Sequence, residues 1–443
     1  MASVRAVWAP LAWVDGAWQK RVLLNIDAHG RWSSIESGID EAPDGASAVS
    51  GPALPGIVNA HSHAFQRAFA GRAEQRTAAH DDFWSWREQM YAVANRISPE
   101  ELRDVATSLY DEMLRGGYTH VCEFHYLHLD TAARRYEDPI AMARALCEAA
   151  TATGIGLTIL PVLYERAGFN DTPLRPEQRR FFAGVDDVIG YRDAIRALGT
   201  RNVDAGVAIH SLRAARPGSI AALCERGSDD AGPIHIHVAE QTREVEECVA
   251  STGLRPIEWL VDNVALDGRW HLVHATHATP SEIASVGASG AGVVLCPTTE
   301  ANLGDGLTDL AGWLASGTPL SIGSDSQVTR DWREELRLLE YGQRLAHRRR
   351  NIAAGSMSTG TRLFGEAVRA GGAAVGHSRW GFVPGARADL AVADPEDAAL
   401  RDMPPAHLLD ALTFVSPGRP FRDVMVAGRW ALRNGRAPGA AVG

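Results

Sequence analysis

The stretch LPGIVNAHSHAFQRAF, residues 54–69, contains an apolar run that stops abruptly at two histidines. The run covers 54–58, and His61 and His63 follow it, one residue apart. Residues i and i+2 of a β-strand point to the same face and lie about 6.6 Å apart along the strand. The two imidazoles can therefore converge on one cation, although a hydrogen-bonded pair of core histidines is the alternative for this motif alone.

Seven more short apolar segments, each ending in polar residues, follow this one along the chain: 119–126, 155–164, 203–212, 233–240, 269–277, 291–300 and 318–327. Their length and apolar character predict strands that are buried on both faces of a parallel sheet. Segments of helical character lie between them; Ser98, Pro99 and Glu101 mark the start of one helix, and Gly116 marks its end. Eight strands alternating with helices predict an α/β fold, a (β/α)8 TIM-type barrel.

The two ends of the chain differ from this middle part. Residues 1–54 and 383–443 contain short β-like pieces with tight turns. Because each flank is too small for a core of its own, we expect both to pair into one small β-sandwich domain beside a barrel at 55–382. The length of 443 residues suits this division, since such a barrel alone takes roughly 250 residues.

Composition excludes several classes of protein. The net charge of −10 argues against a nucleic-acid surface. Five cysteines without a C-x-x-C motif suggest unpaired thiols in a reducing compartment. The N-terminus lacks the apolar core of a signal peptide, and no apolar run reaches the roughly 18 residues of a membrane span. We therefore expect a cytoplasmic protein with neither nucleic-acid nor membrane partners.

Polar residues gather where the predicted strands end, which is where barrels of this type carry their catalytic groups. HVAE contributes His237 and Glu240, HLVHATH contributes His274, and IGSDS contributes Asp325. Three histidines and one aspartate from separate strand ends suit zinc or a similar divalent ion. Such an ion lowers the pKa of a bound water to near 7. Glu240 lies close enough to His237 to shuttle protons without binding the metal.

Several other histidines are assigned no part in this site. His235 shares a face with His237 but lies deeper in the predicted barrel, so we expect it in the core or behind the ligands. His271 and His277 are predicted bystanders. We expect four further histidines at the surface: His29, His80, His347 and His377.

The order of these groups resembles the amidohydrolase superfamily. Its pattern is an H-x-H ending the first strand, a histidine ending the fifth and another ending the sixth, and an aspartate ending the eighth. HVAE matches the H-x-x-E of its deaminase branch, and GARADLAVAD resembles its terminal β domain. Many members hold two metals bridged by a carbamylated lysine on the fourth strand. Here Lys20 is the only lysine, and the fourth strand ends in His210, so we predict one metal ion.

Six phrases narrow the resemblance to a deiminase family of that branch whose members act on N-formimino-L-glutamate: PGIVNAHSHAFQRAFAG, FWSWREQMY, EFHY, HSLRA, HVAEQ and LVHATH. The resemblance implies hydrolysis to N-formyl-L-glutamate and ammonia in histidine degradation. It implies zinc, with iron as the alternative, at His61, His63, His237 and Asp325. Glu240, His274 and Asp325 would act in catalysis, with the general-base role left open between the last two. Substrate would be bound by Gln66 at the formimino group and by Arg87, Tyr126, His210 and Arg213 at two carboxylates.

Two alternatives stand beside this hypothesis. A guanine- or cytosine-type aminohydrolase of the same superfamily would carry the same metal site. A non-catalytic module that binds an acidic metabolite belongs to a different class, and the complete set of ligand candidates argues against it. The family resemblance also implies a homodimer.

Overall fold

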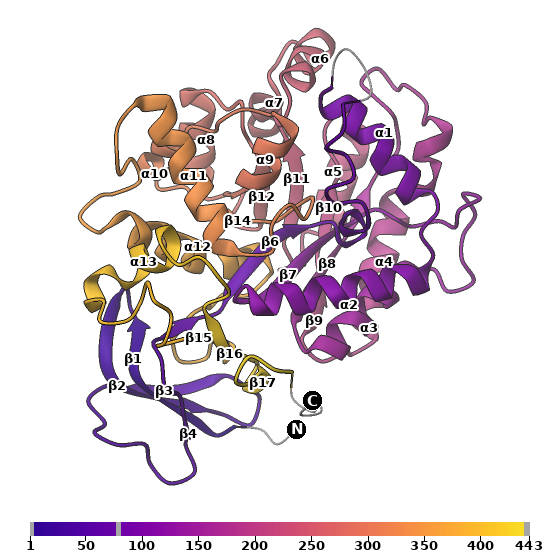
Figure 1. The fold of residues 1–443 in the computed structure, drawn as a ribbon. Helices are drawn as coiled ribbons and strands as arrows, with labels where there is room; N and C mark the ends of the chain where they lie inside the picture. Colours follow the sequence, from indigo (N-terminus) through magenta and orange to yellow (C-terminus); the bar gives the residue numbers. More distant parts are fainter. Residues whose placement is uncertain (1–3, 77–80, 438–443) are drawn as a thin grey trace.

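A computed structural model describes residues 4–76 and 81–437 of the chain. Its central element is a parallel barrel surrounded by helices (Figure 1). The strand order is β14-β13-β12-β11-β10-β8-β7-β6, with β9 paired to β8 just before the interruption at Gly206. The bounds are β6 (Ile57–Ser62), β7 (Tyr118–His125), β8 (Gly156–Leu163), β9 (Val203–Ala205), β10 (Val207–Ile209), β11 (Ile234–Val238), β12 (Trp270–His274), β13 (Gly292–Leu295) and β14 (Leu320–Ile322). These coincide with the eight predicted segments, and the barrel is confirmed.

The barrel closes between β14 and β6. The backbone N–H of Asp325 donates to the carbonyl of His61 (3.0 Å), and the N–H of His63 donates to the carbonyl of Asp325 (3.1 Å). Gly323 permits this close approach, because a Cβ atom there would lie 2.7 Å from the Cβ of His61. Closure therefore brings the end of the first barrel strand beside the loop that follows the last.

Helices cover the outside of the barrel. Helix α2 begins as predicted, since Ser98 accepts the N–H of Glu101 (3.2 Å) and Glu101 accepts the N–H of Ser98 (2.9 Å). The helices are η1 (Ala64–Ala68), α1 (Phe83–Ala94), α2 (Pro99–Arg115), α3 (Ala141–Thr153), η2 (Pro176–Phe181), α4 (Val185–Ala197), α5 (Pro217–Arg226), α6 (Thr242–Thr252), α7 (Pro256–Asn263), α8 (Pro280–Ser289), α9 (Pro297–Leu303), α10 (Leu310–Ser316), α11 (Trp332–His347) and α12 (Thr359–Ala374). None in the described ranges is long and apolar enough to cross a membrane.

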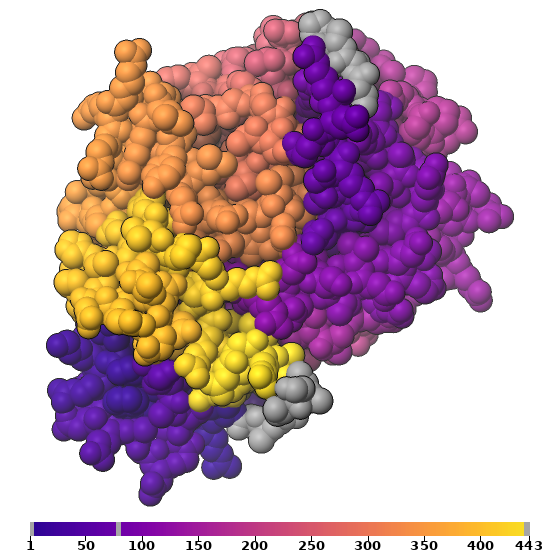
Figure 2. Space-filling model, viewed as in Figure 1, coloured from indigo at the N-terminus to yellow at the C-terminus, as the bar shows by residue number. Residues whose placement is uncertain are grey.

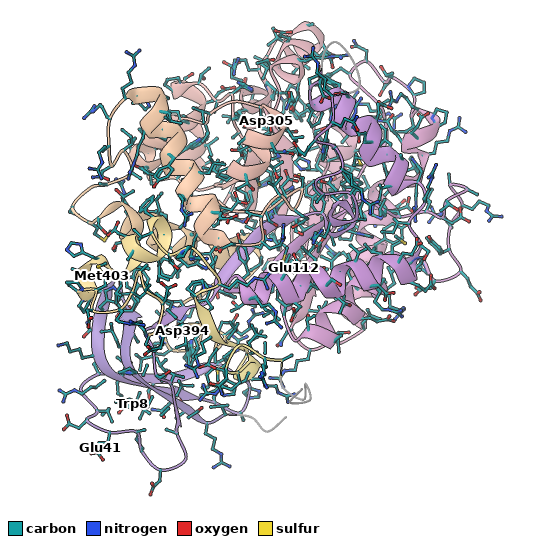
Figure 3. The ribbon with its side chains drawn as sticks, viewed as in Figure 1. Trp8, Glu41, Glu112, Asp305, Asp394 and Met403 are labelled. Carbon is teal, nitrogen blue, oxygen red and sulfur yellow. The ribbon has the colours of Figure 1, made fainter. Side chains whose placement is uncertain are left out.

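The second sheet is built from both ends of the chain. Its order is β17-β16-β15-β5-β1-β2-β3, with β4 against β1. The bounds are β1 (Ala6–Val14), β2 (Ala17–Ile26), β3 (Trp32–Glu36), β4 (Ser47–Ala48), β5 (Ala53–Pro55), β15 (Leu390–Ala393), β16 (Phe421–Val426) and β17 (Arg429–Leu432). Because β5 pairs with β15, the predicted joint β domain is confirmed, and the two ends adjoin on the surface (Figure 2). Trp8 and Glu41 mark this domain, and Asp305 lies far from it at the other end of the barrel (Figure 3).

The C-terminal flank also contains helical structure, which the prediction of short strands over 383–443 did not include. η3 (Pro405–His407) leads into α13 (Leu408–Phe414). Asp410 of α13 accepts the N–H of Gly360 (2.8 Å), and Arg337 donates to the carbonyl of Thr413 (2.7 Å), so α13 packs on barrel helices α12 and α11. The buried positions 408, 409, 411 and 412 have a helical period, which accounts for a helix rather than a strand here. The exact domain boundaries at 54 and 382 stay predictions.

Candidate active site

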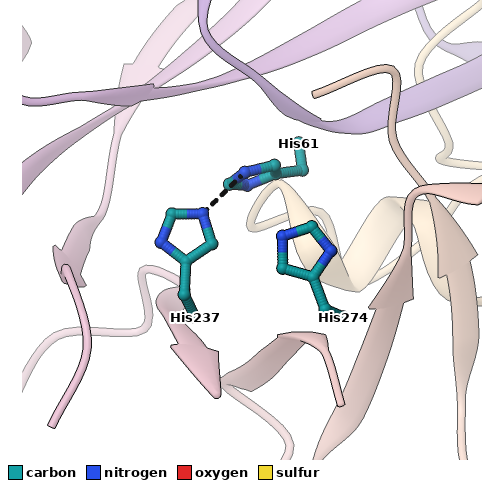
Figure 4. A group of neighbouring side chains, drawn as sticks. All are labelled: His61, His237 and His274. Atoms are coloured by element: carbon teal, nitrogen blue, oxygen red, sulfur yellow. Dashed lines mark hydrogen bonds between the residues drawn. The ribbon is translucent and has the colours of Figure 1, made fainter. Parts of the chain in front are cut away.

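Three imidazoles meet at the carboxyl ends of the barrel strands. The Nε2 atom of His61 lies 3.2 Å from Nε2 of His63 and 3.0 Å from Nε2 of His237. The contact between His61 and His237 is drawn in Figure 4. Two nitrogen ligands of one tetrahedral zinc ion, each roughly 2.1 Å from it, lie roughly 3.4 Å apart. The spacing of the three atoms therefore fits a shared ion.

In two of these rings, the hydrogen bond made by Nδ1 fixes the tautomer of the imidazole. Nδ1 of His63 donates to the carbonyl of Phe124 (2.9 Å), and Nδ1 of His237 donates to the carbonyl of His210 (3.0 Å). Burial lowers the pKa of His63, and it holds the pKa of His61 and His237 well below the usual value. In neutral rings with Nδ1–H, the Nε2 atoms carry lone pairs. Lone pairs that face each other at this distance repel, and a cation bound between them turns this repulsion into attraction.

Asp325 and His274 complete the cluster. Oδ1 of Asp325 lies 3.3 Å from Nε2 of His63 and 3.5 Å from Nε2 of His61. Oδ2 lies 3.7 Å from Nε2 of His274, whose ring is nearly parallel to that of His237. His274 and Asp325 have φ values of +68° and +45°. Such backbone conformations are uncommon for residues other than glycine and concentrate at functional sites.

Glu240 lies beside this cluster in a buried loop after β11. Its Oε1 atom is 3.8 Å from Nε2 of His274, and the described residues that can share a cation with the histidines do not include it. Burial raises the pKa of Glu240 to about 7, with a further contribution from Asp325. Burial alone would lower the pKa of His274, but Glu240, Glu300 and Asp325 raise it to about 10. Burial thus favours a protonated Glu240, and the surrounding carboxylates favour a protonated His274.

A cavity opens from this cluster, and almost every site residue predicted from the sequence lies in its wall. The wall contains His63, Gln66, Arg87, Tyr126, His210, Arg213, His237, Glu240, His274 and Asp325. His61 lies just behind, completely buried. The structure therefore brings together the residues that come from separate strand ends and from α1.

Two arginines line the cavity, and the charge of Arg213 opposes the rise in pKa that burial causes at the carboxyls of Glu244 and Glu240. Neither Arg87 nor Arg213 forms an ion pair with a carboxylate of residues 4–76 or 81–437, and Nε of Arg87 is buried without a hydrogen-bond partner there. Both guanidinium groups pack on Trp84, at 4.5 and 5.4 Å from the ring centre. Burial lowers the pKa of Arg87, and the charge of Arg213 lowers it further. Two adjacent guanidinium groups that are buried or half-buried and form no ion pair in the described chain suit an anion with two carboxylates.

The three neutral candidates line the same wall. The amide nitrogen of Gln66 donates to the hydroxyl of Tyr126 (3.2 Å), whereas its Oε1 atom is buried without a partner among the described residues. Nδ1 of His210 contacts the hydroxyl of Ser211 (3.2 Å), and the His210 ring packs edge-on against Tyr164. Burial and the charge of Arg213 keep the pKa of His210 well below its usual value. All three side chains can form hydrogen bonds with a ligand in the cavity.

Some residues of this region were not predicted from the sequence. Glu300, in the first turn of α9, accepts Nδ1–H of His274 (3.2 Å); the polar end CPTTE of the seventh segment was the available signal. Trp84 lies three residues before Arg87 in FWSWREQMY, but its contact with Arg213 depends on tertiary structure. The same holds for the cavity-lining aromatic residues Tyr91, Tyr164 and Phe181.

The other histidines mostly lie where they were expected. His235 and His271 are buried in the barrel core below the site, and His235 contacts the carbonyl of Ala374 (2.8 Å). His277 is half-buried, and His29 and His347 are exposed. His377 corrects the prediction of a surface position, because it is half-buried against His120 and Trp380. His80 lies outside the described residues.

Comparison with known proteins agrees with this geometry. The model of the Amidohydrolase family matches residues 53–431. The chain belongs to the amidohydrolase family. It is accordingly a hydrolase, and the superfamily resemblance predicted from the strand ends is confirmed.

Individual members of the family give a finer comparison. Formimidoylglutamate deiminase of Pseudomonas aeruginosa is 46% identical over 437 residues, which cover 98% of this chain and 96% of that one. An 8-oxoguanine deaminase of the same organism is 26% identical and covers 87% and 83%. The crystal structure of an amidohydrolase from Brucella melitensis superposes with a TM-score of 0.93 at 40% identity, over 98% and 96%. An atrazine chlorohydrolase from Arthrobacter aurescens, complexed with zinc, shares the fold at 19% identity, with a TM-score of 0.83 over 99% and 97%.

Proposed function

We propose that this chain hydrolyses N-formimino-L-glutamate to N-formyl-L-glutamate and ammonia, a reaction of histidine degradation. The observation that carries the proposal is the pair Arg87 and Arg213, which face the cavity without a carboxylate partner in the described chain. A substrate with two carboxylates supplies the missing charges. The 46% identity with a formimidoylglutamate deiminase supports the same substrate.

We assign one divalent ion, zinc with iron as the alternative, to His61, His63, His237 and Asp325. The converging Nε2 lone pairs and the carboxylate between them support this donor set. When bound, such an ion lowers the pKa of a coordinated water to near 7 and so makes a nucleophile available. The single lysine, Lys20, lies in β2 of the β domain, so it cannot bridge a second ion.

The proposed roles follow from protonation and position. Glu240, with a pKa of about 7, can deliver a proton to the formimino nitrogen, so that ammonia is the better leaving group. His274, whose pKa the carboxylates of Glu240, Glu300 and Asp325 raise, stabilises negative charge that develops on the oxygen added to the reacting carbon. Asp325 lies within 3.7 Å of His274 and can accept a proton from the attacking water. Acid–base steps of this kind typically contribute about 10²–10⁴-fold each.

The substrate-binding residues hold the rest of the molecule. The forked donors of Arg87 and Arg213 match carboxylates in bidentate geometry. Tyr126 and His210 add hydrogen bonds to the same groups. Gln66, whose Oε1 atom is buried and unpartnered in the described chain, can accept an N–H of the formimino group.

Ammonia release tests the proposal. The metal-loaded protein is incubated with formiminoglutamate and, in parallel, with guanine, cytosine and 8-oxoguanine. We expect rapid release from formiminoglutamate and release from the bases lower by several orders of magnitude, because a neutral base leaves both arginines unpaired. Faster release from a base would favour the alternative aminohydrolase, for which the 26% identity with an 8-oxoguanine deaminase is the present support.

The homodimer and the cytoplasmic location stay predictions. Sedimentation velocity of the purified chain tests the first, with a single species of twice the 47.6 kDa chain mass expected.

A further inference from the structure

Among residues 4–76 and 81–437, Glu300 is the one hydrogen-bond partner of His274 on the side away from the cavity. Its Oε1 atom accepts Nδ1–H of His274 (3.2 Å) and also the backbone N–H of Cys296 (2.9 Å). The carboxylate is buried, with 4% of the residue exposed. On the cavity side, Nε2 of His274 faces Oε1 of Glu240 at 3.8 Å and Oδ2 of Asp325 at 3.7 Å. The imidazole thus joins a buried carboxylate to the two acids of the site.

We propose that Glu300 is a positioning residue, which holds the His274 ring with Nδ1–H turned away from the cavity and Nε2 directed at the reacting atoms. This inference rests on the proposed deiminase function. It assigns no contact between Glu300 and the substrate, and Glu300 acts only through the imidazole.

An imidazole needs such a partner because half a turn about the Cβ–Cγ bond exchanges Nδ1 with Cδ2 and Nε2 with Cε1. A flip about the Cβ–Cγ bond exchanges the edges of the ring, and an acceptor on one side selects the edge that carries Nδ1–H. His274 is the last residue of β12, and its φ of +68° departs from extended backbone, so the alternation of side chains along the strand does not set the direction of the ring. Partners of this kind behind a functional histidine typically change activity by about 10–100-fold.

A different role must be separated from this one, because Glu300 also belongs to α9. The backbone N–H of Cys296 precedes this helix, and its bond to Glu300 could serve only to hold α9 in place. Glu335 of α11 offers a matched control, because it bonds to the same first turn of α9. It is buried and accepts both the N–H (2.9 Å) and the hydroxyl (2.7 Å) of Thr298, yet it makes no hydrogen bond to His274.

The experiment compares Glu300→Met, Glu300→Gln and Glu335→Gln with the wild type, using formiminoglutamate. Metal content and melting temperature are measured on each protein. We expect Glu300→Met to lose about 10²-fold in kcat, with KM within about threefold. Glu300→Gln keeps an acceptor oxygen and should recover part of that loss. Glu335→Gln should keep kcat within about threefold even if its melting temperature falls.

The possible results distinguish a failure of the proposed function from a failure of the positioning role of Glu300. No ammonia from the wild-type enzyme overturns the proposed function itself. If the wild type is active and Glu300→Met has the same kcat, the positioning role alone is overturned. A kcat loss in Glu335→Gln as large as that in Glu300→Met would also overturn it, because the effect would then arise from α9. If Glu300→Met does not fold, Glu300→Gln decides, since full wild-type kcat with altered KM would also contradict the inference.

Discussion

His235 and His237 lie two residues apart on β11 and on the same face, yet their environments differ. Nε2 of His237 faces His61, whereas Nε2 of His235 contacts the carbonyl of Ala374 at the other end of the barrel. Depth along the strand therefore decides which histidine can meet a cation. The sequence predicted this difference because catalytic groups of a parallel barrel lie at carboxyl strand ends.

Substitution of Glu240 tests the distinction between ligand and proton shuttle. Glu240→Gln keeps the shape of the side chain but cannot deliver a proton, so we expect a loss of roughly 10² or more in kcat with metal retained. His237→Asn removes a nitrogen from the lone-pair cluster and should lose metal as well. Elemental analysis beside steady-state kinetics measures both. Loss of metal in Glu240→Gln together with full metal in His237→Asn would reverse the two roles.

The metal count follows from another residue, Lys20. Because it lies in the β domain, and His210 follows the fourth barrel strand, a lysine-bridged pair of ions cannot form. Protein stripped with a chelator and reconstituted should bind one divalent ion tightly per chain and regain full activity at that ratio. Activity that requires two ions per chain would show this prediction to be wrong.

At the scale of elements, α1 connects the cavity to the outside of the barrel. It follows the first barrel strand and carries Arg87, and its Trp84 contacts Arg87, Arg213 and also Arg243 of α6. Arg213 lies in the turn after the fourth barrel strand, β10. Two elements far apart in the sequence thus present to one cavity two guanidinium groups that form no ion pair within the described chain.

Arginine substitutions test whether this pair binds carboxylates. Removing one partner of a buried charge pair costs about 2–5 kcal/mol, so Arg213→Met and Arg87→Met should each lower kcat/KM roughly 30-fold to several thousand-fold. We expect kcat to fall as well as KM to rise, because the clamp also positions the reacting carbon. Metal content should not change. An analogue with one carboxylate amidated should bind the wild type more weakly than formiminoglutamate does. In the variant that lacks the arginine facing the amidated group, the additional loss of affinity should be smaller.

Arg243→Met is the matched control for these two variants. Arg243 packs on the same Trp84 ring at 4.5 Å, but it is paired with Glu247 (2.7 Å) and does not line the cavity. Its kcat/KM should stay within about threefold of the wild type, as expected for an exposed ion pair. Wild-type values in both Arg87→Met and Arg213→Met would mean that the carboxylates bind elsewhere.

The sequence predicted the elements that carry chemistry better than those that only pack. The strand ends could be recognised because a short apolar run that stops at histidine or aspartate is a local pattern, visible within ten residues of the chain. The interaction of Glu300 with His274 joins residues 26 positions apart, and no local pattern specifies it. Helix α13 was missed because its few apolar residues lie in a flank otherwise composed of strands, and its burial depends on α11 and α12. Both failures concern contacts between elements.

At the scale of the whole molecule, a buried network attaches the β domain to the amino end of the barrel, opposite the site. Arg387, just before β15, donates to Asp389 (2.6 and 2.9 Å), to Nδ1 of His120 (2.7 Å) and to the carbonyl of Thr119 (3.2 Å). His120 in turn contacts the hydroxyl of Thr158 (2.9 Å). Arg387 and Asp389 are 7% and 3% exposed. One guanidinium group therefore joins the terminal sheet to strand β7 of the barrel.

Arg387→Met should destabilise the fold without changing the chemistry. Breaking a buried pair by removing one partner costs about 3–5 kcal/mol because the remaining charge stays buried. With an unfolding entropy of about 2.1 cal/mol/K per residue, the melting temperature of this chain should fall by roughly 3–5 °C. The matched control is Arg21→Met in the same sheet, where Arg21 and Asp40 form an exposed pair and about 1 kcal/mol or less is at stake. Calorimetry of both variants, with kcat/KM below the transition, measures the difference. An unchanged melting temperature in Arg387→Met would show that the network does not hold the domains together, and a fall in kcat/KM at low temperature would show that the β domain also shapes the site.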